Sequence, residues 1–182
     1  FHCNNFFDTV DRTLEARLDR ETSTISFGGD PTEVHRYPIS LEWPPAPLAA
    51  QKPVAECRAG MRRTLGLGPE VRLGVGVDRL DYTKGILERF AAIERLLELE
   101  PRWIGRFTFV QIAAPSRSSI EEYQSLDARV RAAARRINGR FGSPAYEPIV
   151  LRIEHHDADD VYAWYRAADV CCVSSLHDGM NL

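Results

Sequence analysis

Hydrophobic and polar residues follow two different periods in the second half of the chain. Residues 71–77 form a mainly apolar run, which is typical of a buried strand. The apolar positions that follow recur about every 3.6 residues, the period of an amphipathic helix, at Ile86, Phe90, Ile93 and Leu97. The pattern therefore predicts a strand that leads through a short turn into a helix.

The alternation of strand and helix patterns continues beyond this helix. Further apolar runs predict strands over residues 107–113, 149–153 and 170–173. Helical patterns separate them, so the order is β-α-β-α-β-α-β, which implies a parallel sheet with right-handed crossovers. The expected fold class is α/β, with an incomplete Rossmann-like parallel sheet and flanking helices.

Local signals predict where the helices of this region begin and end. Ser119 with Glu122 fits a capping box that opens a long helix. Asn138-Gly139 is expected to stop that helix. Asp157 is a suitable N-cap for the helix that precedes the last strand.

The N-terminal part of the chain has a different organisation. An apolar face within residues 1–20 predicts an amphipathic helix, with Phe6, Phe7, Val10, Leu14 and Leu18 on that face. Residues 24–27 and 32–37 are predicted to form two short strands around a turn at residues 28–31, Gly-Gly-Asp-Pro.

A concentration of prolines marks the join between two domains. Five prolines lie between residues 38 and 53 and exclude regular secondary structure there. We place the boundary near residue 45, so that residues 1–45 belong to a first domain and a linker. Residues 46–182 then form a second domain, which opens with a predicted helix over residues 54–65.

Composition narrows the functional classes. The 182 residues are 44% hydrophobic and 27% charged, with a net charge of −3, so no basic field favours nucleic acid or an anionic membrane. No apolar run approaches the roughly 20 residues that span a bilayer. Cys171 and Cys172 are adjacent in a predicted strand, and Cys3 and Cys57 match no metal-ligand spacing. The cysteines favour a reducing, cytoplasmic compartment.

The turn after the first buried strand carries the residues best suited to chemistry. Arg79 and Lys84 are two cations, and Gly85 allows a tight turn into the helix. Ligands bind at the carboxyl ends of parallel strands, and cations beside a helix N-terminus suit a diphosphate. The alternative is pairing of the two cations with acidic surface neighbours, namely Asp78, Asp81 or Glu88.

Four ordered segments resemble one enzyme family. Residues 77–85, Val-Asp-Arg-Leu-Asp-Tyr-Thr-Lys-Gly, resemble the signature of the trehalose-6-phosphate synthases, which are retaining GT-B glycosyltransferases of family 20. Residues 111–117, 136–142 and 178–182 are similar to further segments of that family. The resemblance implies an internal piece of a longer synthase, inactive alone, without most of the first (acceptor-side) domain and the end of the donor domain.

The resemblance also implies roles for individual residues. Arg79 and Lys84 would contact the diphosphate of a nucleotide-sugar donor and stabilise charge on the leaving phosphate. Asp178 would contact the transferred glucose. Arg117 would belong to the donor pocket, and the loop with His156 would hold the base through its backbone. Gly179 would let the backbone approach the ligand closely. Backbone N–H groups that hold phosphate oxygens would come from Met180, Asn181 and Leu182. No metal or other cofactor is implied.

Structural alternatives exist for several of these residues. Arg117 also fits a solvated loop or a partner of Glu121, and Asp178 also fits an N-cap. His155 and His156 are adjacent, so a strand would point them to opposite faces, which argues against a shared metal ion. A run of arginines in the predicted long helix favours a structural role over phosphate or nucleic-acid binding: Arg129, Arg131, Arg135, Arg136 and Arg140.

The implied reaction moves glucose from UDP-glucose to glucose 6-phosphate with retention, giving α,α-trehalose 6-phosphate and UDP. One rival is a glucosylglycerol-phosphate synthase that uses glycerol 3-phosphate, and another donor nucleotide is equally open. A second rival is a catalytically silent regulatory domain. The expected partners are a nucleotide sugar and a sugar phosphate, without nucleic acid or membrane, and a homo-oligomer of the full-length protein is left open.

Overall fold

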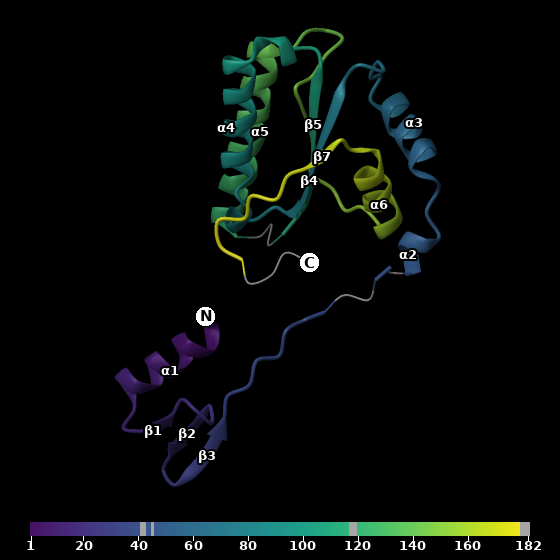
Figure 1. The fold of residues 1–182 in the computed structure, drawn as a ribbon. Coiled ribbons are helices and arrows are strands. Elements are labelled where there is room, and N and C mark those ends of the chain that lie inside the picture. Colours follow the sequence, from purple (N-terminus) through teal and green to yellow (C-terminus); the bar gives the residue numbers. More distant parts are fainter. Residues whose placement is uncertain (41–42, 45, 117–119, 179–182) are drawn as a thin grey trace. The chain divides into compact units, whose positions relative to one another are not determined.

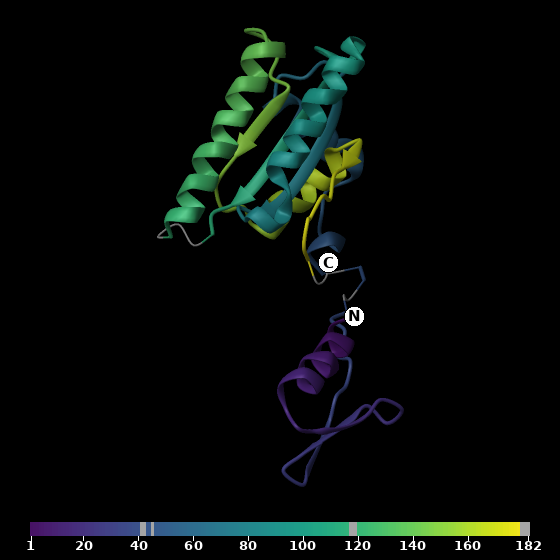
Figure 2. The same cartoon turned by 90° about the vertical axis from the view of Figure 1, so that its left-hand side faces the viewer.

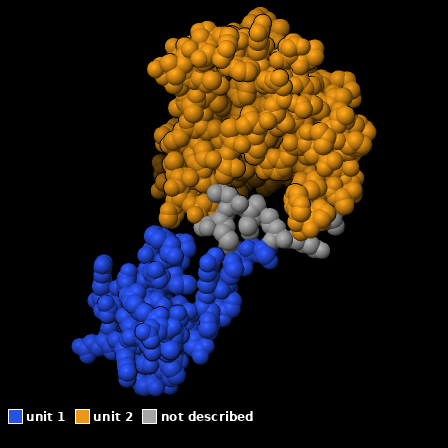
Figure 3. All heavy atoms as spheres, viewed as in Figure 1, with its two compact units in different colours: residues 1–42 blue, residues 43–182 orange. Residues whose placement is uncertain are grey.

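The computed structural model describes residues 1–40, 43–44, 46–116 and 120–178. The chain divides into two compact units, residues 1–42 and residues 43–182, which Figure 3 colours separately. Each unit is considered by itself.

The first unit is a helix followed by a three-stranded antiparallel meander. Its elements are α1 (His2–Thr13), β1 (Arg17–Asp19), β2 (Thr24–Phe27) and β3 (Asp30–Glu33), with sheet order β1-β2-β3. The two-residue turn at Gly28-Gly29 has positive φ at both positions, as a tight hairpin requires. Phe7, Val10 and Ile25 form a small buried core.

The predicted helix of the first unit was too long. The helix ends at Thr13, Phe6 and Leu14 are exposed, and Leu18 lies in β1, where it is paired with Ile25 of β2. The backbone of residues 17–19 bonds to β2 instead of continuing the helix, which the apolar period alone did not indicate. The second predicted strand begins at residue 30 instead of 32 because the hairpin turn takes only two residues.

The second unit alternates helices and strands. Its elements are α2 (Ala46–Ala49), α3 (Val54–Thr64), β4 (Arg72–Arg79), the 3-10 turn η1 (Tyr82–Lys84), α4 (Ile86–Leu99), the 3-10 turn η2 (Pro101–Trp103), β5 (Phe107–Ala114), α5 (Glu121–Phe141), β6 (Ile149–Arg152), α6 (Ala158–Ala167) and β7 (Val170–Cys171). All four strands are parallel, in the order β6-β5-β4-β7. The predicted α/β class with a parallel sheet is confirmed.

Helices cover both faces of this sheet, with α4 and α5 side by side on one face and α3 and α6 on the other (Figures 1 and 2). On the first face, the four apolar positions predicted for α4 are all buried against Phe109 and its neighbours. On the second face, Leu73 and Val75 of β4 pack with Trp164 of α6. Each face therefore has its own hydrophobic core.

Two helix-boundary predictions had different outcomes. Asp157 caps α6 as predicted, since its Oδ1 accepts from the Asp160 N–H at 2.8 Å. Asn138-Gly139 does not stop α5, which runs on to Phe141. The Asn138 side chain instead donates to the Ile149 carbonyl at 2.7 Å and accepts from the Ile149 N–H at 2.9 Å. The amide therefore joins α5 to β6.

Other local expectations had different outcomes. The proline-rich segment was predicted to lack regular secondary structure, but it contains the short helix α2. The N-cap of α5 is Ile120, which makes no side-chain capping bond, and the predicted capping residue Ser119 lies outside the described residues. The last strand is short and ends at Cys171, which is exposed, whereas Cys172 lies just beyond it and is half-buried. Among the described residues, no helix combines the length and apolar character needed to cross a bilayer.

Candidate functional site

The strand order reverses beside β4, which lies between β5 and β7. In open parallel sheets, this switch point is where ligands bind, in the crevice at the carboxyl ends of the two strands. The loop that follows β4 comprises residues 80–85, and the segment that follows β7 comprises residues 172–178. We call these the β4 loop and the β7 loop.

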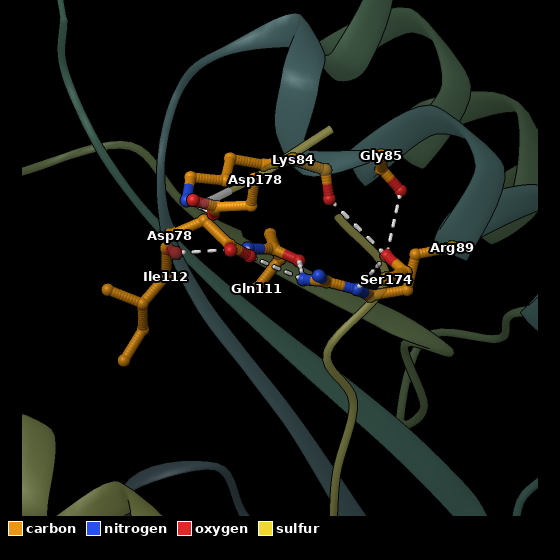
Figure 4. Close-up of polar contacts among 8 residues, drawn as sticks. All are labelled: Asp78, Lys84, Gly85, Arg89, Gln111, Ile112, Ser174 and Asp178. Atoms are coloured by element: carbon orange, nitrogen blue, oxygen red, sulfur yellow. Dashed lines mark hydrogen bonds and ion pairs between the residues drawn. The ribbon is translucent and has the colours of Figure 1, made fainter. Parts of the chain in front are cut away.

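The β4 loop and the β7 loop are bonded to one another. The Thr83 carbonyl accepts from the N–H groups of Leu176 and His177, at 2.8 and 3.4 Å. The Ser174 hydroxyl lies 3.1 Å from the Gly85 carbonyl and 3.4 Å from the Lys84 carbonyl, and donates to this pair of oxygens (Figure 4). The two loops therefore form one continuous backbone surface at the switch point.

Asp81 shapes the β4 loop. Its buried carboxylate accepts from the Thr83 N–H at 2.9 Å, from the Thr83 hydroxyl at 2.8 Å and from the Tyr123 hydroxyl at 3.3 Å. Burial acts to raise the pKa of Asp81, but these hydrogen bonds and the charge of Arg79 outweigh it, so the pKa lies below its ordinary value. Asp81 is thus an ionised cap of η1.

Lys84 and Asp178 face each other across the two loops. The Lys84 ammonium forms an ion pair with Asp178 Oδ2, and the two side chains are 16% and 19% exposed. The alternative pairing of Lys84 with Asp81 or Glu88 is not observed. The structure thus brings together two predicted site residues that are 94 positions apart in the chain.

Arg79 lies at the end of β4, at the same edge of the sheet. It is exposed, and it makes no ion pair with a described residue. Asp78, one of its predicted alternative partners, pairs instead with Arg89. Arg79 is therefore available to a ligand at the switch point.

Arg89 is a site residue that sequence reasoning missed. Its Nη1 donates to Asp78 Oδ2 at 2.7 Å and to Gln111 Oε1 at 2.6 Å, and its Nε donates to Ser174 Oγ at 3.0 Å (Figure 4). The side chain is 3% exposed. Gly76 of β4 was a signal in the sequence that another group lies close to this strand, because a glycine within a strand often marks such a close approach.

His156 lies after β6, at the far side of the sheet from β7. Its side chain is 7% exposed, and its Nδ1 pairs with Asp160 of α6. No three His, Cys, Asp or Glu side chains gather as metal ligands would within the part of the chain that the structure describes. His156 is thus at the ligand-binding edge but apart from Lys84 and Asp178.

Some predicted residues lie outside the described part of the chain. These are Arg117, Gly179, Met180, Asn181 and Leu182. The arginine run of α5 is described, and three of its members form ion pairs away from the switch point. Arg131 pairs with Asp127, and Arg136 and Arg140 both pair with Glu94 of α4. This agrees with the structural role favoured for the run.

Comparison with known proteins relates the chain to one family. The model of glycosyltransferase family 20 matches residues 2–182. The alpha,alpha-trehalose-phosphate synthase (UDP-forming) of Pichia angusta is 36% identical over 181 residues, covering 100% of this chain and 38% of that protein. The chain therefore spans little more than a third of this relative's length.

Solved structures give the same relationship. An alpha,alpha-trehalose-phosphate synthase (UDP-forming) from Burkholderia xenovorans in complex with glucose-6-phosphate is 32% identical, with a TM-score of 0.81 over 98% of this chain and 39% of that one. A structure described as trehalose-6-phosphate from E. coli bound with UDP-2-fluoro glucose is 30% identical, with a TM-score of 0.80 over 97% of this chain and 38% of that one. The resemblance and the GT-B architecture it implied are confirmed. The chain belongs to glycosyltransferase family 20.

Proposed function

We propose that the protein carrying this chain transfers glucose from UDP-glucose to glucose 6-phosphate with retention, giving α,α-trehalose 6-phosphate and UDP. The observation that carries the proposal is the Lys84–Asp178 pair at the switch point, beside the exposed Arg79. In our proposal the two cations bind the donor diphosphate, and the neighbouring carboxylate accepts hydrogen bonds from sugar hydroxyls. The names of the relatives supply the substrates: one is complexed with glucose-6-phosphate and another with a UDP-sugar analogue.

The chemistry we propose needs charge stabilisation more than a nucleophile. The bond between glucose C1 and the β-phosphate oxygen of the donor breaks, and its electron pair stays on UDP. The acceptor's anomeric hydroxyl forms the new bond to C1 on the same face, and its proton passes to the leaving phosphate. Lys84 and Arg79 stabilise the negative charge that builds on UDP during this step.

The start of α4 adds to this charge stabilisation. Gly85 is the residue before α4, and the first N–H groups of a 14-residue helix have no partner within the helix. Such a helix N-terminus attracts phosphate oxygens. In our proposal these fixed groups do the work of a metal ion, so the reaction requires no metal cofactor.

The remaining donor contacts are proposed from the family resemblance. Asp178 accepts hydrogen bonds from hydroxyls of the transferred glucose, and the loop of His156 holds the base through its backbone. Arg117 belongs to the donor pocket, and backbone N–H groups of residues 180–182 hold donor phosphate oxygens. A nucleotide-sugar substrate and the free state of all four cysteines are consistent with a cytoplasmic location.

A product analysis of the complete protein tests the proposal. UDP-glucose is supplied with glucose 6-phosphate or with glycerol 3-phosphate, UDP release is followed, and the anomeric configuration of the product is read by NMR. Trehalose 6-phosphate with the α configuration at both anomeric carbons is the expected product, formed equally in the presence of EDTA. If only glycerol 3-phosphate supports turnover, the proposed acceptor is wrong. If there is no turnover with UDP-, ADP- or GDP-glucose, the assignment as an enzyme is wrong.

A further inference from the structure

Arg89 is a charged residue on the apolar side of a helix. It lies one turn into α4, next to the buried Phe90, and only 3% of its side chain is exposed. Its own N–H donates to the Gly85 carbonyl at 3.0 Å, the same carbonyl that accepts from Ser174. A buried guanidinium is costly unless its charge and its donors are matched.

The partners of Arg89 come from three separate parts of the site. Asp78 is at the end of β4, Gln111 is in the neighbouring strand β5, and Ser174 is in the β7 loop. Gln111 also donates to Asp78 at 3.4 Å and to the Ile112 carbonyl at 3.0 Å, which fixes its orientation (Figure 4). One side chain therefore connects α4 to both strands and to the β7 loop.

Ser174 passes this connection on to the β4 loop. Its hydroxyl oxygen accepts from Arg89 Nε, so its single proton is directed to the carbonyls of Lys84 and Gly85. Those carbonyls flank the turn that carries the Lys84 side chain. The chain of contacts runs from Arg89 through Ser174 to the residue that pairs with Asp178.

The surroundings of Arg89 are adapted to this residue. A Cβ at Gly76 would collide with Arg89 Nη1 and would lie 2.8 Å from Gln111 Oε1. Arg89 Nη2 is buried and has no hydrogen-bond partner among the described residues. Apolar side chains in place of both Arg89 and Asp78 would avoid the buried ion pair and the unpaired donor, and such a replacement of a whole buried pair is often stabilising. Stability alone thus gives no reason for a buried ion pair here.

We propose that Arg89 is a positioning residue that sets the spacing of the β4 loop and the β7 loop, so that Lys84 and Asp178 face one donor molecule. This rests on the proposed function of the site. Arg89 acts through Ser174 and Asp78 and does not itself touch the substrate. Displacement of reacting groups by about 1 Å costs on the order of 100-fold in rate, so loss of this spacing is expected to lower kcat strongly.

The test compares Arg89→Met, Arg89→Lys and Ser174→Ala in the complete protein. Arg62→Met is the matched control, because Arg62 is also mostly buried and donates to the Gly68 and Val71 carbonyls, at 2.8 and 2.6 Å. Those contacts lie at the amino end of β4, away from the site. Each variant is measured for thermal midpoint, kcat, KM for UDP-glucose and hydrogen exchange of the β7 loop.

Arg89→Met is expected to lower kcat by about 100-fold and to speed exchange of the Leu176 and His177 amides, with exchange in α6 unchanged. Arg89→Lys should restore part of kcat, because an ammonium still pairs with Asp78. Ser174→Ala, which keeps Arg89, should speed exchange of the same two amides to a smaller extent. This variant tests the proposal if Arg89→Met does not fold. Arg62→Met should lower only the thermal midpoint.

Two results would overturn the proposal. One is that the Leu176 and His177 amides exchange at the wild-type rate in both Arg89→Met and Ser174→Ala. The other is that Arg89→Met lowers kcat no more than Arg62→Met does, when the two variants lower the thermal midpoint equally. If the wild-type protein turns over no sugar nucleotide, the proposed function fails, whereas the exchange measurement still decides whether Arg89 sets the spacing of the loops.

Discussion

Gly85 faces the carbonyl oxygen of Ser174 so closely that a Cβ on Gly85 would collide with it. Gly85 also has φ of 64°, in the left-handed region that side chains disfavour. Both properties arise where η1 ends and α4 begins, at the contact between the β4 loop and the β7 loop. Gly85 therefore allows the two loops to touch.

Gly85→Ala should destabilise the protein by roughly 2–4 kcal/mol, because left-handed strain of about 1–2 kcal/mol adds to the collision with Ser174. Gly66→Ala is the matched control, since Gly66 has φ of 63° and open space around an added Cβ. It should cost only the strain. Urea unfolding of both variants measures the difference. Equal losses of unfolding free energy would show that the collision with Ser174 does not affect stability.

Arg79→Ala and Lys84→Ala should each lower kcat/KM for UDP-glucose by about 100-fold, because each removes one fixed charge from the leaving diphosphate. Arg106→Ala is the control, since Arg106 is exposed and precedes β5 at the opposite end of the strands. Initial rates of UDP release measure the effect. Wild-type rates for Arg79→Ala and Lys84→Ala would remove both residues from the proposed donor site.

Asp178→Asn should separate nucleotide binding from sugar transfer. The carboxylate pairs with Lys84, so its neutralisation frees the ammonium for the diphosphate. We expect UDP to bind at least as tightly as to the wild type, while kcat falls about 100-fold because acceptors for the sugar hydroxyls are weakened. Calorimetry with UDP and initial-rate kinetics test the two parts, and weaker UDP binding would contradict the first.

The Asp81 carboxylate is expected to give the protein an acid-sensitive component of stability. Its pKa in the folded protein lies below the ordinary 3.8, so its contribution is fully present above about pH 4 and is lost as the pH falls through the lowered pKa. Asp81→Asn lacks this component, so the gap between wild type and variant should shrink below about pH 4. Thermal midpoints from pH 3 to 7 measure it. Glu147→Gln, an exposed control, should run parallel to wild type.

Asn138→Ala should lower the free energy of unfolding by about 1–3 kcal/mol, since two hydrogen bonds to the Ile149 backbone are lost and that backbone is partly buried. Arg135→Ala, on the exposed side of the same helix, should change it by less than about 0.5 kcal/mol. Urea midpoints of the two variants decide. A loss equal to that of Arg135→Ala would mean that the amide does not hold α5 to β6.

The local pattern predicted most of the second unit. The strands and helices after residue 70 follow hydrophobic periods that predict which face of each element is buried. The structure buries those faces in its two hydrophobic cores. Boundaries were less accurate where a tertiary bond replaced a local signal. Asn138 illustrates this, because an asparagine before a glycine usually ends a helix, whereas here its amide bonds to β6.

The candidate site was predictable where its residues form a contiguous motif. Arg79 and Lys84 follow a buried strand and precede a helix, so a cation-bearing turn at the edge of the sheet was expected. Their partners were not predictable from local spacing. Asp178 reaches Lys84 only because β7 pairs with β4, and that pairing depends on the strand order of the whole sheet.

The sequence by itself determined the alternation of strands and helices after residue 70, the parallel sheet and the turn that carries the cations, because these depend on periodicity and on residues close together in the chain. Only the tertiary structure decided how Arg89 is used. Its partners Asp78, Gln111 and Ser174 lie 11, 22 and 85 positions away, and the space for its guanidinium is provided by Gly76 in another element. Strand register and helix packing bring these groups together, and both are set by burial across the whole domain.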